Sequence, residues 1–272
     1  MSEIDGKQIA QRILDRAKRK VERMHVRPTL AVIMVGDNPA SAKYVEKKAQ
    51  AAEYVGIDFF VHRFPETVNP EQIAEQIHVL QMRNDAVILQ LPLPKGFDSK
   101  PLLDKIPFHK DADCLSSAGI GSMMRNIGLV MAPTAGAIVE ILNSKKVSLK
   151  GKHVVVVGQG ELVGKPAVAM LMNEAVTLTV CGLGTKKLSD FTKLADILIT
   201  GVGKAGLITG QMIKKGAIVI DAGTSFVKGK IAGDIDFKTV SKKAKYVTPT
   251  PGGVGPITVA LLLENVVNLA DK

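Results

Sequence analysis

Two residues that could do chemistry, Tyr44 and Lys48, lie four positions apart in a segment predicted to be helical over residues 40–54. This spacing puts both side chains on one face of the helix. A lysine can transfer protons near neutral pH only when burial or a cationic ligand lowers its pKa from the ordinary value of about 10.4. Most such pairs belong to ordinary helix surface, so other polar side chains must converge on this one to indicate a site.

Further polar residues are candidates to lie near the pair. Gln90 interrupts the apolar segment 87–91 where a buried strand is predicted to end. Its side chain would emerge at the carboxyl edge of a parallel sheet, which is where ligands bind in doubly wound folds. Asp111 and Asp113 follow in an irregular segment. Taken alone, Gln90 could be satisfied by loop backbone, and the two aspartates could serve only a turn.

A glycine-rich turn over residues 158–164 indicates a dinucleotide site. Its sequence, Gly158-Gln159-Gly160-Glu161-Leu162-Val163-Gly164, follows an apolar strand and opens a helix, where backbone N–H groups can hold a pyrophosphate. Val163 stands where G-x-G-x-x-G has its third glycine, so the motif is a variant. A tight turn that binds nothing is the alternative.

The residues after the next strand bear on the choice of dinucleotide. That strand ends at residues 181–183 without the acidic residue that binds the ribose 2′-hydroxyl of NAD. Lys186 and Lys187 follow, so the sequence favours NADP, with NAD possible. In short-chain dehydrogenases the glycine-rich turn precedes the Tyr-x-x-x-Lys pair. Here the pair comes first, which argues against that class.

Composition excludes several other classes of protein. The chain has 272 residues, 46% hydrophobic and 23% charged, which is enough to bury a core in one or two domains. The net charge of +10 favours anionic partners, but the aromatic content of 4% argues against nucleic-acid binding. Two cysteines are too few for a disulfide framework or a zinc site, so we expect no metal. The polar N-terminus and the lack of a long apolar segment predict a soluble cytoplasmic protein without a membrane span.

The periodicity of apolar residues predicts the elements that position these side chains. An amphipathic helix opens the chain and is followed by alternating strands and helices, which predicts a parallel sheet. An irregular segment at about 92–133 leads to a second α/β series, in which the glycine-rich turn lies. The predicted strands are 29–35, 57–63, 86–91, 153–157, 176–181, 195–200, 217–221 and 245–247, and the last helix starts near 258. The fold class is therefore α/β with two parallel-sheet lobes.

A set of motifs runs in order along nearly the whole chain, and the most specific is Pro-Gly-Gly-Val-Gly-Pro at 251–256. The others are Val35-Gly36-Asp37, Tyr44, Lys48, Gln90-Leu91-Pro92-Leu93, Lys110-Asp111-Ala112-Asp113, Val163-Gly164-Lys165-Pro166, Gly216-Ala217-Ile218-Val219-Ile220-Asp221 and Pro249-Thr250. Together these motifs resemble the methylenetetrahydrofolate dehydrogenase/methenyltetrahydrofolate cyclohydrolase family.

The resemblance implies a folate lobe over residues 1–118 with 256–272, and a Rossmann-type NAD(P)-binding domain over 119–255. Folate would lie in a cleft, with Lys48 as the catalytic lysine and Gln90 hydrogen-bonded to it. Tyr44 would contact the folate body and Asp113 would anchor the pterin. The dinucleotide would be held by Gly158, Gln159, Gly160, Gly164 and Thr224. A homodimer, formed through the nucleotide-binding domain, is also implied.

Several positions depart from the family pattern. Gln159 stands where members usually have a small residue or Arg, and Leu183 lies near the place where members hold a 2′-phosphate with Ser or a basic residue. Residues 132–135 lack a usual basic residue, and Cys114 replaces a glycine. The predicted function is oxidation of 5,10-methylenetetrahydrofolate with NADP and hydrolysis of the product to 10-formyltetrahydrofolate. One alternative is a cyclohydrolase with weak or NAD-linked dehydrogenase activity. Another is a non-catalytic binding protein, which the retention of Tyr44, Lys48, Gln90 and Asp113 argues against.

Overall fold

The computed structural model describes residues 2–271, apart from the side chains of Ser2 and Ala40. The chain forms two compact units, described here separately. The three-stranded unit comprises residues 11–133 and the chain from 259 onward, and the six-stranded unit comprises residues up to 10 and 134–258. These boundaries differ from the predicted ones at 118/119 and 255/256. The first residues join the six-stranded unit because β1 (Ser2–Glu3) pairs in parallel with β11 (Tyr246–Val247).

The three-stranded unit contains a parallel sheet in the order β3-β2-β4. Its strands are β2 (Thr29–Val35), β3 (Asp58–Phe64) and β4 (Ala86–Leu89). Six of the seven residues of β2 are buried, which confirms that this strand is covered on both faces. β4 ends two residues before the prediction, because the chain leaves the sheet at Gln90.

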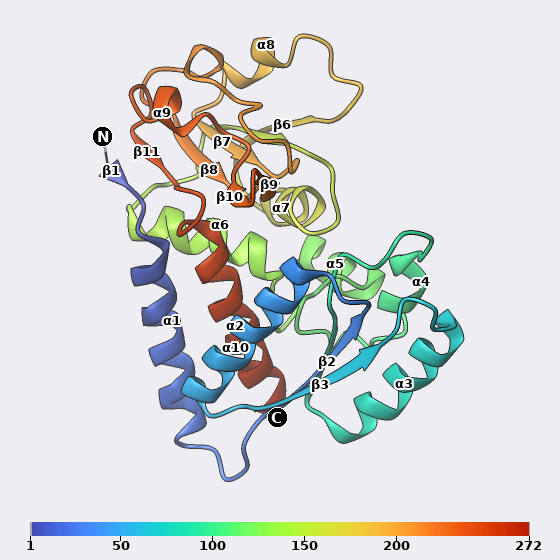
Figure 1. The fold of residues 1–272 in the computed structure, drawn as a ribbon. Coiled ribbons are helices and arrows are strands. Elements are labelled where there is room, and N and C mark those ends of the chain that lie inside the picture. The colour runs from blue at the N-terminus through green and yellow to red at the C-terminus, as the bar shows by residue number, and fades with distance from the viewer. Residues whose placement is uncertain (1, 272) are drawn as a thin grey trace. The chain divides into compact units, whose positions relative to one another are not determined.

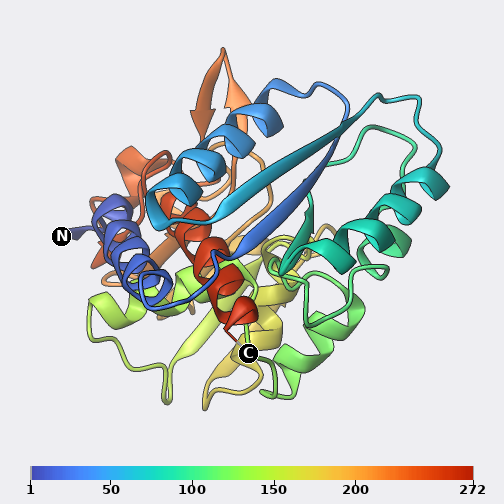
Figure 2. The ribbon, with the colours of Figure 1, turned by 90° about the horizontal axis from the view of Figure 1, so that it is seen from below.

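Helices cover both faces of this sheet (Figures 1 and 2). Apolar side chains of α1 (Gly6–Val21), α2 (Pro39–Val55) and α10 (Val254–Ala270) pack on one face. Those of α3 (Pro70–Arg83) and α4 (Ser99–Leu103) pack on the other. Alternate residues of β2 point to the two cores, as the period of two along a strand requires. A short helix, α5 (Ser117–Met124), follows α4.

The six-stranded unit is a parallel sheet in the order β1-β11-β8-β7-β5-β6. The chain passes from β5 to β6 on one side of it and then crosses to β7 on its other side. The strand order therefore reverses beside β5, which makes this a topological switch point. Its further strands are β5 (His153–Val157), β6 (Thr177–Cys181), β7 (Ile197–Thr200) and β8 (Ile218–Asp221). The remaining elements are α6 (Pro133–Ser144), α7 (Gly164–Leu171), α8 (Leu188–Thr192), η1 (Gly210–Met212), α9 (Phe237–Val240) and the antiparallel hairpin of β9 (Ser225–Val227) and β10 (Lys230–Ala232).

Both units place the carboxyl ends of parallel strands next to the residues that the sequence singles out. Gln90 follows β4, and Gly158 follows β5. Across residues 2–271, no helix is both long and apolar enough to cross a membrane.

Candidate active site and dinucleotide site

Lys48 on α2 and Gln90 after β4 lie in direct contact. Lys48 Nζ donates a hydrogen bond to Gln90 Oε1 over 3.0 Å. Gln90 is 9% exposed, and its Nε2 donates to the carbonyl of Leu91 over 2.7 Å. Because the amide nitrogen is committed to a backbone acceptor, the amide oxygen must face the lysine. The side chain of Gln90 therefore has a fixed orientation toward Lys48.

Asp113 completes this cluster electrostatically. Burial lowers the pKa of the Lys48 amine, and the charge of Asp113 partly opposes that fall. Burial also raises the pKa of the Asp113 carboxyl, and the charge of Lys48 acts in the other direction. Both effects arise because a charged group loses hydration when it leaves water. Lys48 is thus more easily neutral than a surface lysine, which a proton-transferring lysine requires.

A network of buried hydrogen bonds holds the loop that presents Asp113. The Asp111 carboxylate, 1% exposed, accepts the backbone N–H of Ser116 over 2.8 Å. Burial raises the pKa of Asp111 to about 6. From α10, Asn265 Nδ2 donates to the carbonyl of Ala112 over 2.8 Å. Asp111 and Asp113 therefore differ in role: the first supports the loop from inside, and the second interacts electrostatically with Lys48.

Cys114 adopts the conformation that its glycine counterpart would favour. Its φ of 53° is in the left-handed region, where glycine is least strained. The side chain is 1% exposed, and burial raises the pKa of its thiol to about 12. Cysteine is thus accommodated at this position with the loop backbone in the left-handed region.

Tyr44 and a residue not predicted, Ser41, lie on the same face of α2 as Lys48. Tyr44 is half-buried one turn before the lysine. Ser41 is 5% exposed, and within residues 2–271 its Oγ has no hydrogen-bond partner. A buried hydroxyl without a partner is costly, so Ser41 is a candidate to bind a ligand. In the sequence, the spacing Ser41-x-x-Tyr44-x-x-x-Lys48 places Ser41 on the face of Lys48, but it does not show that the hydroxyl lacks a partner.

The glycine-rich turn has the tight geometry that a dinucleotide-binding turn needs. Gly158 has φ +112°, and a Cβ on Gly164 would lie 2.1 Å from the Gly158 carbonyl oxygen. Gly164 therefore allows the close packing that the third glycine of G-x-G-x-x-G allows in other dinucleotide-binding turns. The side chain of Val163 occupies space that Gly201 leaves free. A Cβ on Gly201 would lie 2.2 Å from that side chain, so only glycine leaves room for it. Around a Cβ on Gly160 there is open space within 4 Å, and backbone can be approached there.

Gln159 covers the end of β6, where the ribose of a dinucleotide would be selected. A Cβ on Gly182 would lie 2.3 Å from Gln159 Oε1, so the carboxamide lies against this glycine. Leu183 is fully exposed, and Lys186 and Lys187 are exposed. A neutral carboxamide and two exposed cations therefore stand where NAD sites typically have an acidic residue. Thr224, the last predicted cofactor residue, is exposed three residues after β8.

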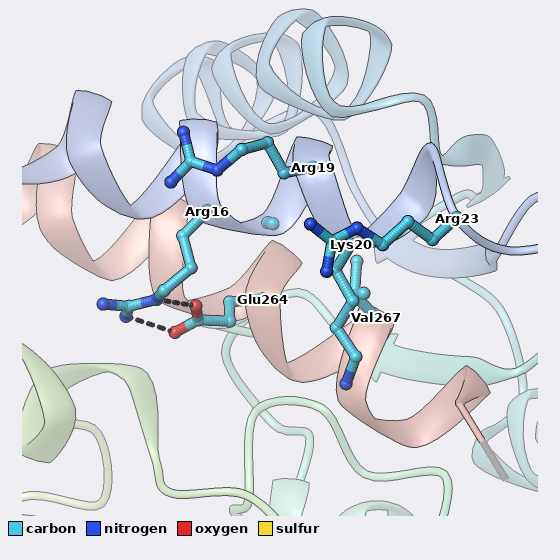
Figure 3. Close-up of a pocket in the computed structure, with 7 residues that line it drawn as sticks. Arg16, Arg19, Lys20, Arg23, Glu264 and Val267 are labelled. Carbon is cyan, nitrogen blue, oxygen red and sulfur yellow. Dashed lines mark hydrogen bonds and ion pairs between the residues drawn. The ribbon is translucent and has the colours of Figure 1, made fainter.

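A separate hollow of about 380 Å³ lies between α1 and α10 (Figure 3). Four cations line it, but none of the predicted catalytic residues does. Arg16 donates two hydrogen bonds to Glu264, over 2.5 and 2.8 Å, and Lys20 forms an ion pair of 2.9 Å with Asp271. These ion pairs join α1 to α10 and to Asp271, the residue after α10, and are each worth about 0–1 kcal/mol. The lining residues are Arg16, Ala17, Arg19, Lys20, Arg23, Glu264 and Val267.

The fold and these residues define a two-unit α/β protein with a Rossmann-type sheet and a site built around a half-buried lysine. Two family models match the chain: the tetrahydrofolate dehydrogenase/cyclohydrolase catalytic domain over residues 4–113, and the NAD(P)-binding domain of the same family over 132–272. The bifunctional protein FolD of Nitratiruptor is 42% identical over 278 aligned residues, which cover 100% of this chain and 99% of that protein.

Solved structures agree with these matches. The bifunctional FolD enzyme of Campylobacter jejuni superposes with a TM-score of 0.95 at 37% identity, over 99% of this chain and 98% of that one. The Trypanosoma brucei FolD, solved with NADP and an inhibitor, has a TM-score of 0.93 at 35% identity, over 98% of this chain and 96% of that one. The chain belongs to the bifunctional FolD methylenetetrahydrofolate dehydrogenase/cyclohydrolase family. This confirms the predicted family, fold class and pair of enzyme activities, together with an NAD(P)-binding domain.

Proposed function

We propose that the chain oxidises 5,10-methylenetetrahydrofolate with NADP and hydrolyses the methenyl product to 10-formyltetrahydrofolate, with Lys48 as the catalytic residue of the hydrolysis. The observation that carries the proposal is the half-buried Lys48, which is held by Gln90 and interacts electrostatically with Asp113. A lysine whose pKa is lowered by burial can accept and return a proton, as the hydrolytic step requires. The family membership of the chain supplies the substrate class.

Hydrolysis needs a group that accepts a proton and returns it. Water adds to the methenyl carbon and loses a proton to neutral Lys48. Protonation of folate N5 then breaks the bond between that nitrogen and the former methenyl carbon. Loss of the hydroxyl proton leaves the formyl group on N10, so one proton is released overall. Gln90 holds Lys48 Nζ by one N–H, which leaves the lone pair of a neutral amine free for the water.

The folate would be held by side chains of the same unit. Asp113 can accept two hydrogen bonds from the 2-amino group and a ring N–H of the pterin, which a neutral residue would match poorly. Tyr44 would contact the folate body. The Ser41 hydroxyl, which is buried without a partner among the described residues, would gain one from the bound folate.

Residues of the glycine-rich turn fit a dinucleotide. Gly158 and Gly164 approach each other closely, and the space beside Gly160 is open, so Gly158, Gly160 and Gly164 would hold the pyrophosphate. Gln159 and Thr224 would also help to hold the dinucleotide. When bound, the dinucleotide supplies the hydride acceptor, and the protein contributes binding and orientation.

NADP is proposed as the preferred dinucleotide, with a modest margin over NAD. No carboxylate at the end of β6 repels a 2′-phosphate, and Lys186 and Lys187 supply positive charge nearby. Gln159 and Leu183 add no charge, which favours a second candidate function, a cyclohydrolase with weak or NAD-linked dehydrogenase activity. A homodimer, which the family resemblance implies, and a cytoplasmic location, which the composition favours, are further parts of the proposal.

One assay tests the proposed function. Purified protein is given 5,10-methylenetetrahydrofolate with NADP or NAD in parallel, and the absorbance of the methenyl product is followed, with its hydrolysis measured separately. Faster formation with NADP, together with hydrolysis, is expected. Hydrolysis without reduction of either dinucleotide would favour the second candidate, and neither activity would refute the proposal.

A further inference from the structure

Two buried aspartates of the six-stranded unit, Asp221 and Asp234, take no part in the chemistry described above. Asp221 is 1% exposed and Asp234 is 0% exposed. Their carboxylates accept hydrogen bonds from backbone N–H groups and from one threonine hydroxyl. Burying two carboxylates side by side is unfavourable, and burial raises the pKa of Asp221 to about 6. The hydrogen bonds that the two carboxylates accept hold the turns after β7 and β8.

Asp234 holds the turn that follows β7. Its Oδ2 accepts the hydroxyl of Thr200 over 2.7 Å and the N–H of Val202 over 2.6 Å. Its Oδ1 accepts the N–H of Lys204 over 2.8 Å. Gly203, between these donors, has φ +77°. One side chain therefore binds both ends of the turn 202–204 and the last residue of the strand before it.

This turn lies next to the glycine-rich turn. Gly201 directly precedes it, and a Cβ on Gly158 would lie 2.6 Å from the Gly201 carbonyl oxygen. Val163 packs against Gly201 from the other end of the glycine-rich turn. A shift of residues 201–204 would therefore be transmitted to both ends of the glycine-rich turn.

Asp221 fixes Asp234 in turn, and with it the loop after β8. Asp221 Oδ1 accepts the N–H groups of Asp234 and Gly223, over 3.1 and 3.0 Å, and its Oδ2 accepts that of Ile235 over 3.2 Å. A Cβ on Gly223 would lie 2.1 Å from the Asp234 carboxyl carbon, so this loop packs directly on the second carboxylate. Thr224, a proposed cofactor residue, is the next residue.

We propose that Asp234 is a positioning residue for the dinucleotide, acting through the turn 202–204 and held in place by Asp221. The proposal rests on the proposed dinucleotide site at residues 158–164. The carboxyl ends of β5, β7 and β8, where these turns lie, form the edge at which doubly wound sheets bind ligands. Asp234 touches no reacting atom in this account.

Asp234→Asn tests the proposal, because an NH₂ group replaces one acceptor oxygen and cannot serve its donors. Calorimetry with NADP in the absence of folate should show a dissociation constant raised at least about 10-fold, as expected for lost hydrogen bonds to a charged acceptor. The KM for NADP should rise with it. The cyclohydrolase rate, measured without dinucleotide, should stay within about twofold of the wild-type rate. Asp236→Asn, two residues along the chain, is the matched control and should leave NADP affinity unchanged.

A gentler variant keeps the test valid if Asp234→Asn does not fold. Thr200→Val removes only one donor to Asp234 and should raise the NADP dissociation constant about threefold. An unchanged NADP dissociation constant in the folded variants would overturn the proposal. This holds also if the dehydrogenase and cyclohydrolase activities fall equally, because that loss would reflect less folded protein. A wild-type protein that hydrolyses methenyltetrahydrofolate but binds no dinucleotide would refute the proposed dinucleotide site as well.

Discussion

The Lys48 Nζ and the Gln90 Oε1 are 3.0 Å apart, and this hydrogen bond joins the middle of α2 to the carboxyl end of β4. A glutamine oxygen can accept from lysine in both of its protonation states without adding charge. Burial can therefore lower the pKa of Lys48 while its position stays fixed. Gln90 therefore fixes the position of Lys48 without raising the pKa of the lysine, whereas a carboxylate in its place would fix the position but raise that pKa.

Gln90→Glu should move the pH profile of the cyclohydrolase. A carboxylate beside Lys48 would favour the ammonium form and raise the pKa of the lysine. Because the neutral amine is the proposed base, the rising limb of the rate should shift to higher pH, with a loss of at least about 10-fold at pH 7. The neutral variant Gln90→Met should reduce the rate without moving the limb upward. A limb unmoved by the new charge would contradict the proposed base.

Asp113→Ala should weaken folate binding far more than dinucleotide binding. Each hydrogen bond lost to a charged acceptor costs about 1.5–3 kcal/mol. Calorimetry with a folate analogue and with NADP separates the two effects. Asp58→Ala, an exposed carboxylate of the same unit, serves as the control. Equal affinity of Asp113→Ala and wild type for the folate analogue would remove Asp113 from the pterin site.

Replacing Lys186 and Lys187 by alanine should bring the kcat/KM values for NADP and NAD together. The lysines are exposed, so their attraction for a 2′-phosphate is screened and the wild-type preference for NADP should shrink as salt rises. The double variant should lose activity with NADP only. Lys238 and Lys242, also exposed, give a control double variant with the same net charge. A wild-type ratio in the Lys186 and Lys187 variant would show that these lysines are ordinary surface charges.

Asp111→Asn should change the pH dependence of stability. Burial raises the pKa of Asp111 from 3.8 to about 6, so the folded protein binds this proton more tightly than the unfolded chain. The contribution to the free energy of unfolding is then largest below pH 4 and falls by up to about 3 kcal/mol as pH rises through 6. Urea unfolding at pH 4.5 and 7.5 should show that the free energy of unfolding of the variant, relative to that of the wild type, is higher at pH 7.5 than at pH 4.5. An equal difference at both pH values would be inconsistent with the raised pKa.

The fold was predictable where apolar periodicity was strong. Strands 29–35 and 153–157 have the predicted bounds because both are short buried runs that end at glycine. Several elements were not predicted, among them the short helices α8, η1 and α9. β1 is two polar residues, the hairpin of β9 and β10 is largely exposed, and α6 was not distinguished from the irregular segment before it.

The candidate site was predictable in part for the same physical reason. Gln90 and Lys48 could be placed together because Gln90 follows one strand, the helix that carries Lys48 follows another, and parallel strands bring their carboxyl ends to one edge. The unpaired hydroxyl of Ser41 could not be inferred, since its lack of a partner depends on every neighbour in the folded chain. The same holds for Asp234, whose donors lie about 30 residues away in the sequence.

The most direct test of the account is the rate of methenyltetrahydrofolate hydrolysis by Lys48→Met, followed by the loss of methenyl absorbance. General acid–base help is typically worth about 10²–10⁴-fold, so the rate should fall by that order. Binding of a folate analogue and the unfolding midpoint should be largely retained, and the exposed neighbour Lys47→Met should hydrolyse at the wild-type rate. Hydrolysis by Lys48→Met at close to the wild-type rate would contradict the assignment of Lys48 as the proton-transferring residue.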